Sequence, residues 1–64
     1  MKWSRDDRML MMLYGEKNLQ DTIASMQGVR DSLAADETDL DQMLKSVIWK
    51  LRQISEKEYA AMRM

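Results

Sequence analysis

The acidic residues between positions 36 and 41 are the densest group of side chains in this sequence that could do chemistry. Asp36, Glu37, Asp39 and Asp41 carry carboxylates, which are the ligands that hard cations such as Ca²⁺ prefer. A calcium-binding EF-hand loop also needs a central glycine and a distal bidentate glutamate, and neither stands at the required offset. The run instead favours the first turn of a helix, where acids stabilise the helix dipole. We therefore expect no metal site.

Catalytic chemistry finds little support in the residue types. The 64-residue chain contains neither His nor Cys, so the commonest general base and the most reactive nucleophile are missing, and disulfides are excluded. Ser4 and Ser55 are both explained as helix caps. A chain of this length encloses little of a pocket in which other side chains could be activated. We expect a protein that is not an enzyme and needs no cofactor.

The beginning of the sequence is locally basic and carries an aromatic residue. Lys2, Arg5 and Arg8 could contact phosphates, while Trp3 could stack on a base. Acids alternate with these cations, and the net charge of the chain is −1. The overall charge therefore does not attract nucleic acid. Solvated helix surface is the preferred interpretation of these cations. A small DNA-binding accessory factor is the alternative function.

Methionine is the unusual residue, with eight copies in 64 positions. In the stretch MLMML, Met9, Met11 and Met12 spread over more than half the circumference of a helix, and one core cannot bury them all. Methionine is flexible and polarizable, and it is common on surfaces that accept partners. We therefore predict a protein-binding surface of Met9, Met11 and Met12 together with Trp3 or Trp49. Gap filling in a small core is the alternative, and a homodimer contact is another.

The elements that position these residues are predicted to be helices. The chain lacks Pro, is rich in good helix formers, and shows no alternating strand pattern. The first helix follows a capping box of Ser4 and Asp7 and is expected to end at Gly15 in a left-handed conformation, with Leu13 on its core face. The second helix begins at Asn18. Gly28, inside it, predicts a closely crossing helix or a mild kink.

A long helix and a short one complete the prediction. The long helix is capped by Asp36 and carries an apolar stripe that runs from Leu40 to Ile54, with an ion pair between Asp41 and Lys45. Ser55 ends it and, with Glu58, forms the capping box of the last helix. Tyr59 and Met62 then fold that helix over the end of the core as a lid. Residues 1–64 form a single helical domain, an all-α bundle of about four short helices.

The order of these signals resembles that of a known family, the transposon-transfer-assisting proteins of clostridial and related Gram-positive bacteria. The stretches that carry the resemblance are MKWS, LYG, DTIASMQGVRDSL, DETDLDQMLKSVIWKL and ISEKEYAAM. The sequence departs from the family pattern at Val29-Arg30, where a Met-Arg pair is usual. The resemblance implies a small all-helical domain in the setting of a conjugative transposon, and it supplies no catalytic residue.

The predicted function combines these observations. The first residues lack the features of a secretory signal, and no stretch approaches the roughly 20 apolar residues that cross a bilayer, so we expect a cytoplasmic protein without membrane contact. We expect a non-enzymatic accessory protein of a conjugative transposon. It would assist or regulate transfer by contacting another protein, for which the transfer machinery is the natural candidate.

Overall fold

Four α-helices make up the part of the chain that the computed structural model describes, which is the backbone of residues 3–63 and the side chains of residues 3–62. In order they are α1 (Arg5–Tyr14), α2 (Leu19–Asp31), α3 (Thr38–Leu51) and α4 (Glu56–Arg63). No strand occurs among these residues. The prediction of a small all-α bundle is confirmed.

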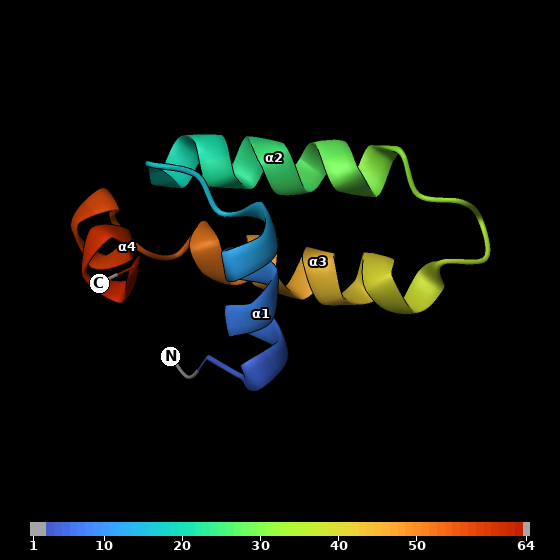
Figure 1. Cartoon of the computed structure of the whole chain (residues 1–64), viewed down its shortest axis with the longest axis horizontal. Coiled ribbons are helices and arrows are strands. Elements are labelled where there is room, and N and C mark those ends of the chain that lie inside the picture. The colour runs from blue at the N-terminus through green and yellow to red at the C-terminus, as the bar shows by residue number, and fades with distance from the viewer. Residues whose placement is uncertain (1–2, 64) are drawn as a thin grey trace.

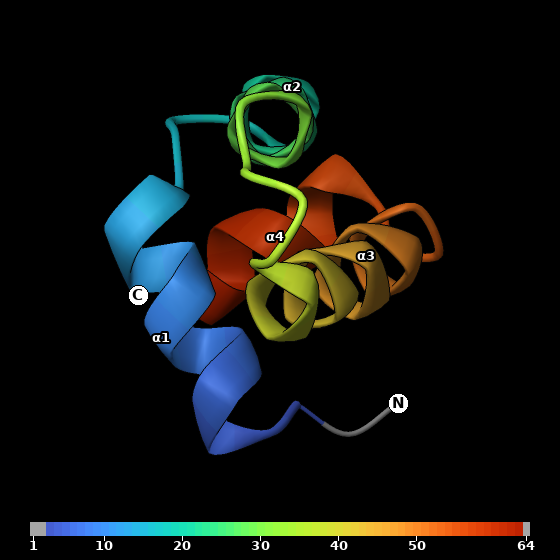
Figure 2. The ribbon, with the colours of Figure 1, turned by 90° about the vertical axis from the view of Figure 1, so that its right-hand side faces the viewer.

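The two longest helices form the body of the molecule. α2 and α3 run antiparallel, side by side, and are joined by the loop of residues 32–37 (Figure 1). α1 crosses them on one side, as the end-on view of the pair shows (Figure 2). α4 lies at the end of the body where α3 finishes and α2 begins, and its main helix contact is with α2.

α1 begins with the predicted capping box. The Ser4 hydroxyl accepts a hydrogen bond from the Asp7 N–H (3.1 Å), and the Asp7 carboxylate accepts one from the Ser4 N–H (2.9 Å). The helix ends at Gly15, but this residue has φ −66° and ψ 144°, so the predicted left-handed conformation is wrong. Glycine is needed for a different reason. A Cβ at position 15 would lie 2.1 Å from the Met11 carbonyl oxygen.

α2 begins as predicted, with the Asn18 side chain accepting a hydrogen bond from the Asp21 N–H (2.8 Å). The close helix crossing predicted at Gly28 is wrong. Gly28 is exposed, and a Cβ added there would meet no atom within 4 Å outside its own helix backbone and chain neighbours. The absence of a side chain at this position is therefore not required by packing.

α3 is shorter than predicted at both ends. It begins at Thr38 after Glu37, without a side-chain cap, so the expected cap at Asp36 is wrong. It ends at Leu51 and does not reach Ser55, which leaves Ile54 in a turn where it still packs against the core. The predicted pair of Asp41 with Lys45 is also wrong.

The partner of Asp41 is Arg30, whose Nε lies 2.8 Å from a carboxylate oxygen of Asp41. This ion pair connects α2 to α3. A sequence pattern within one helix favours neighbours one turn apart, but the antiparallel packing of two helices brings in a competing cation from the other.

α4 closes the core with a single large side chain. The Ser55 hydroxyl accepts a hydrogen bond from the Glu58 N–H (3.2 Å), which confirms Ser55 as the cap but supplies only one of the two hydrogen bonds of the predicted capping box. Tyr59 is buried, whereas Met62 is 36% exposed, so Tyr59 is the residue of the predicted lid that enters the core. The other buried apolar residues come from the first three helices: Leu10, Leu19, Met26, Leu44, Val47, Ile48 and Leu51.

The exposed position of Gly28 yields a stability prediction. Replacing Gly28 by Ala should raise the free energy of unfolding by about 1 kcal/mol, because alanine loses less backbone entropy in a helix and meets no neighbour here. Urea denaturation followed by circular dichroism measures the change. Gly15→Ala is the opposite control and should destabilise the fold, since its Cβ would collide with the Met11 carbonyl group. Destabilisation by Gly28→Ala would contradict this account.

Candidate partner surface

The five residues of the predicted protein-binding surface divide into two groups. Met9, Met12 and Trp49 are exposed, at 44%, 82% and 61%. Trp3 and Met11 are half-buried and pack against the core. The structure thus leaves three of the five side chains accessible, and it places them on two different helices.

The exposed side of α1 is the larger apolar feature. Leu13, predicted to face the core, is 64% exposed, which is a correction. Residues three and four apart share a side of a helix, so Met9 lies beside both Met12 and Leu13. The same spacing places Arg5 next to Met9 and Arg8 next to Met12. We call these five residues, Arg5, Arg8, Met9, Met12 and Leu13, the α1 outer face.

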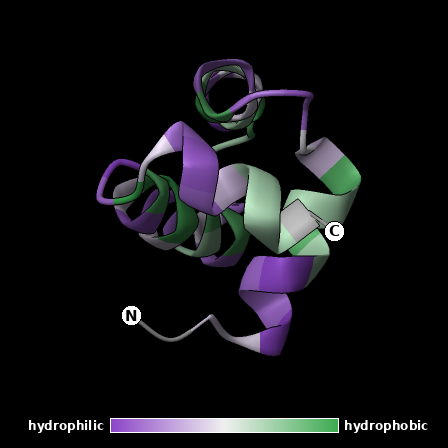
Figure 3. Ribbon diagram, turned by 90° about the vertical axis from the view of Figure 1, so that its left-hand side faces the viewer, coloured by the Kyte–Doolittle hydropathy of each residue, from purple (hydrophilic) through white to green (hydrophobic). Residues whose placement is uncertain are grey.

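The hydropathy of α1 changes along its length. The first turns are hydrophilic, whereas the second half is hydrophobic and follows the MLMML stretch (Figure 3). Leu10 is buried, and Tyr14 and Met11 pack partly against the core. The apolar residues therefore surround the second half of the helix, and only the side toward α2 and α3 is covered. This arrangement explains why several of them reach solvent.

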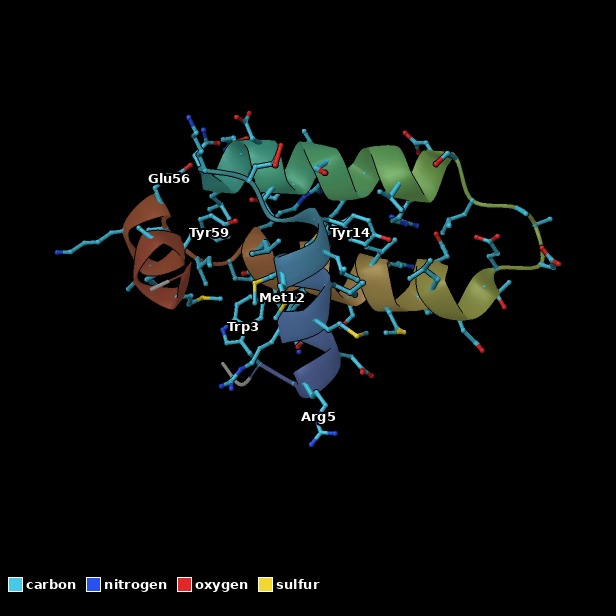
Figure 4. All side chains as sticks on the ribbon, in the orientation of Figure 1. Trp3, Arg5, Met12, Tyr14, Glu56 and Tyr59 are labelled. Atoms are coloured by element: carbon cyan, nitrogen blue, oxygen red, sulfur yellow. The ribbon has the colours of Figure 1, made fainter. Side chains whose placement is uncertain are left out.

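A hollow of about 400 Å³ lies beside the outer face. Its lining comes from Arg8, Met11, Met12 and Gly15, and from Met62 of α4. Figure 4 shows Met12 on α1 and Arg5 projecting away from the bundle. The hollow thus brings together methionines from two helices that are far apart in the sequence.

Trp49 belongs to a separate surface. It lines a shallow hollow on α3 with Gln42, Lys45 and Ser46, and none of these residues borders the hollow beside Met12. Trp49 and the α1 outer face are therefore alternatives rather than parts of one site.

The predicted nucleic-acid contacts are only partly described. Lys2 lies outside the described residues. Arg5 and Arg8 are both exposed on α1, one turn apart. The ion pairs among the described residues are Arg30–Asp41 and Lys50–Asp7, and neither includes these two arginines.

α1 is attached to the body by an ion pair that the sequence analysis missed. Lys50 of α3 donates a short hydrogen bond to the Asp7 carboxylate, which is 7% exposed. The Lys50 ammonium group also lies 5.8 Å from the ring centroid of Trp3, within the range of a cation–π contact. Asp7 and Lys50 are 43 positions apart, so no local pattern could reveal the contact.

The Asp7 carboxyl has a lowered pKa. Burial, the largest single influence, acts to raise the pKa, because it disfavours the charged form. The hydrogen bond from Lys50, the hydrogen bonds from Ser4 and the positive charge of Lys50 together outweigh burial. Asp7 therefore stays ionised and serves both the helix cap and the contact with α3.

α4 is attached by polar contacts around Tyr59. Its hydroxyl donates to the Glu16 carbonyl oxygen (2.9 Å) and shares a short hydrogen bond with the buried hydroxyl of Thr22. The Thr22 hydroxyl in turn accepts from the Glu16 N–H (2.8 Å). Figure 4 shows Tyr59 directed from α4 toward this turn, with Glu56 beside the start of α2. The Glu56 carboxylate accepts from the Leu19 N–H at 3.0 Å and so caps α2 from another helix.

The acids at positions 36–41 do not form a metal site. Among the described residues no group of three or more acidic side chains could hold a metal ion. Asp41 points instead to Arg30. Within residues 3–63, no helix combines the length and the apolar composition needed to cross a bilayer.

Comparison with known proteins identifies the family. The family described as "Putative transposon-transfer assisting protein" matches residues 4–64, which is nearly the whole chain. The chain belongs to this family. The match covers all four helices, and the resemblance noted in the sequence is confirmed. Neither the curated proteins nor the solved structures give a match.

The description of the family points to a role in assisting transposon transfer. It specifies no mechanism and no contact with protein or DNA. Two surface features of the described residues are suited to such a role: the apolar and basic outer face of α1, and the separate exposed Trp49 on α3.

The Asp7–Lys50 pair predicts a pH-dependent contribution to stability. The pKa of Asp7 is about 3.9 in the unfolded chain and lower in the folded protein. The contribution is therefore complete above about pH 5 and is lost as the pH falls below about 4, through the folded pKa. Asp7→Asn should lower the free energy of unfolding by about 1–3 kcal/mol near neutral pH, and by progressively less in acid.

Urea denaturation of both proteins between neutral and acidic pH measures this difference. Asp6→Asn is the matched control, because Asp6 is an exposed acid in the same helical turn. A difference between wild type and Asp7→Asn that grew as the pH fell would contradict the assigned direction of the shift.

The Tyr59 contacts predict a second stability effect. Tyr59→Phe should lower the free energy of unfolding by about 1–2 kcal/mol, because it leaves the buried Thr22 hydroxyl and the Glu16 carbonyl group with one hydrogen bond fewer. Tyr14→Phe is the matched control, because the Tyr14 hydroxyl makes no hydrogen bond within the described residues. This variant should change the free energy of unfolding by less than about 0.5 kcal/mol. Thermal and urea denaturation compare the two. Equal effects of both variants would refute the role of the Tyr59 hydroxyl.

Proposed function

We propose that this protein is a non-enzymatic, cytoplasmic accessory factor of a conjugative transposon that assists transfer by binding another protein through the α1 outer face. The family membership supports the mobile-element setting. The lack of His and Cys in the sequence supports a role without catalysis.

One observation carries the proposal. Met9, Met12 and Leu13 are exposed together on one side of α1, although eight other apolar residues within the described part of the chain already form the buried core. The fold therefore does not require these three side chains to be apolar. Clustered exposed apolar residues are typical of protein contacts, and methionine suits a surface that adapts to its partner.

The test is affinity capture of the tagged protein from cells that carry the element, with and without nuclease, followed by mass spectrometry. A specific protein should remain after nuclease treatment, and Met12→Gln should abolish its recovery while circular dichroism shows an intact fold. Met12 is preferable to Met11, because Met11 packs partly against the core and its replacement would disturb folding as well.

Trp49→Gln is the matched control, since it removes an exposed apolar side chain from a different helix. Loss of the partner with Trp49→Gln but not with Met12→Gln would overturn the assignment to α1. A melting temperature that rises with protein concentration, together with no captured partner, would instead indicate a homodimer.

DNA binding is the second candidate function, favoured by the two exposed arginines one turn apart on α1. In that case every specific partner should disappear after nuclease treatment. The affinity for duplex or single-stranded DNA should then fall steeply with salt, since phosphate contacts release counterions. DNA binding that is absent, or insensitive to salt, would dismiss this candidate.

A further inference from the structure

The hollow between α1 and the end of α4 has the form of a receptor for one large apolar side chain. Its methionines, Met11, Met12 and Met62, have flexible side chains that adjust to an inserted group. Its volume of about 400 Å³ lies at the lower end of the range of small-molecule pockets, roughly 300–1,000 Å³. Gly15 contributes only backbone atoms to the lining.

The hollow exists because α4 is held elsewhere. Tyr59 and Glu56 attach α4 to α2 and to the turn that precedes it, and the main helix contact of α4 is with α2. Met62, near the other end of α4, lines the hollow together with residues of α1 and remains 36% exposed. The contacts that hold α4 thus leave this space beside α1 unfilled by described residues.

The one charged residue among the five that line the hollow is an arginine of α1. Arg8 lines it, and Arg5 lies one turn earlier on the same helix. Neither belongs to an ion pair among the described residues. No acid is among the five lining residues, but exposed acids stand close to two of them: Glu16 follows Gly15, and Glu58 lies one turn before Met62. The positive charge is thus confined to the α1 side of the hollow, where Arg8 favours a carboxylate on an incoming partner.

We propose that the occupant is an acidic amphipathic segment of a partner protein. A large apolar side chain of this segment enters the hollow, and a neighbouring carboxylate pairs with Arg8. This inference rests on the proposed function and adds the chemical class of the partner. Burial of the apolar side chain supplies affinity at the centre of the contact, while the positive charge of Arg8 favours a partner that is negatively charged there.

A displayed library of random peptides tests the proposal without a known partner. Selection on the wild-type protein should enrich peptides in which Asp or Glu stands within a turn of Leu, Met, Phe or Trp. Arg8→Glu should weaken binding of those peptides at least about tenfold and should enrich basic peptides in a fresh selection. Arg8→Lys, which keeps the charge, should retain most of the affinity. Glutamate is compatible with this helix, since position 8 lies in its N-terminal half.

Methyl NMR of the methionines locates the bound peptide. The methyl signals of Met11, Met12 and Met62 should shift on titration. Those of Met26, which is fully buried, and Met43, which is half-buried on α3, serve as internal controls and should stay in place. Shifts confined to other methyl groups would overturn the assignment to this hollow.

The remaining outcomes separate this inference from the proposed function. Three outcomes would overturn the proposal that the occupant is an acidic segment. They are enrichment of apolar peptides without acids, peptide binding that is insensitive to Arg8→Glu, and no enriched peptide at all. A protein captured from cells whose recovery depends on Met12 but not on Arg8 would leave the proposed function standing. Methyl shifts that depend on protein concentration alone would show that a second copy occupies the hollow, which also overturns the proposal.

Discussion

The buried hydroxyl of Tyr59 is the contact on which the arrangement of the helices depends. Tyr59 enters from the shortest helix and reaches the Glu16 carbonyl group and the Thr22 hydroxyl, so it joins α4 to the turn between α1 and α2 and to α2 itself. A helix as short as α4 is not stable alone in water and must dock. Burying an aromatic ring supplies apolar contact, and placing its hydroxyl on the turn determines where the helix lies.

The position of α4 has consequences for α1. Because α4 is attached to α2 through Tyr59 and Glu56, it does not cover the side of α1 that carries Met12. α1 is held on its other side, by Leu10 in the core and by the pair of Asp7 with Lys50. An apolar and basic surface thus remains accessible on a helix that is well anchored. This combination is suited to partner binding, since the contact residues can change without loss of the fold.

The small size of the chain explains why charged residues are used to connect its helices. Among the described residues, eight apolar ones form the buried core, so each additional contact between helices matters. Asp7 serves two contacts with one carboxylate, which caps α1 and accepts a hydrogen bond from Lys50. Its lowered pKa keeps it ionised. Arg30 and Asp41 make a second connection, between α2 and α3. Both pairs join different helices and therefore fix how the helices lie relative to one another.

The sequence by itself determined the local features of this protein. Helix formers, apolar spacing and the caps at Ser4, Asn18 and Ser55 depend on residues a few positions apart, so the four helices could be predicted, together with the family. The start and end of α3 could not be predicted. Asp36 and Ser55 are residue types that cap helices well, but α3 begins after Asp36 and ends before Ser55. Five apolar residues between positions 9 and 13 also gave no sign of which would be buried.

Only the tertiary structure decided that choice, since burial depends on where the other helices pack. It buried Leu10, exposed Leu13 and Met12, and paired Asp41 with Arg30 instead of Lys45. It also brought Met62 to the hollow that Met12 lines and Lys50 beside Asp7, across 50 and 43 positions of sequence. Such contacts depend on the docking of whole helices, which no spacing within a single helix encodes.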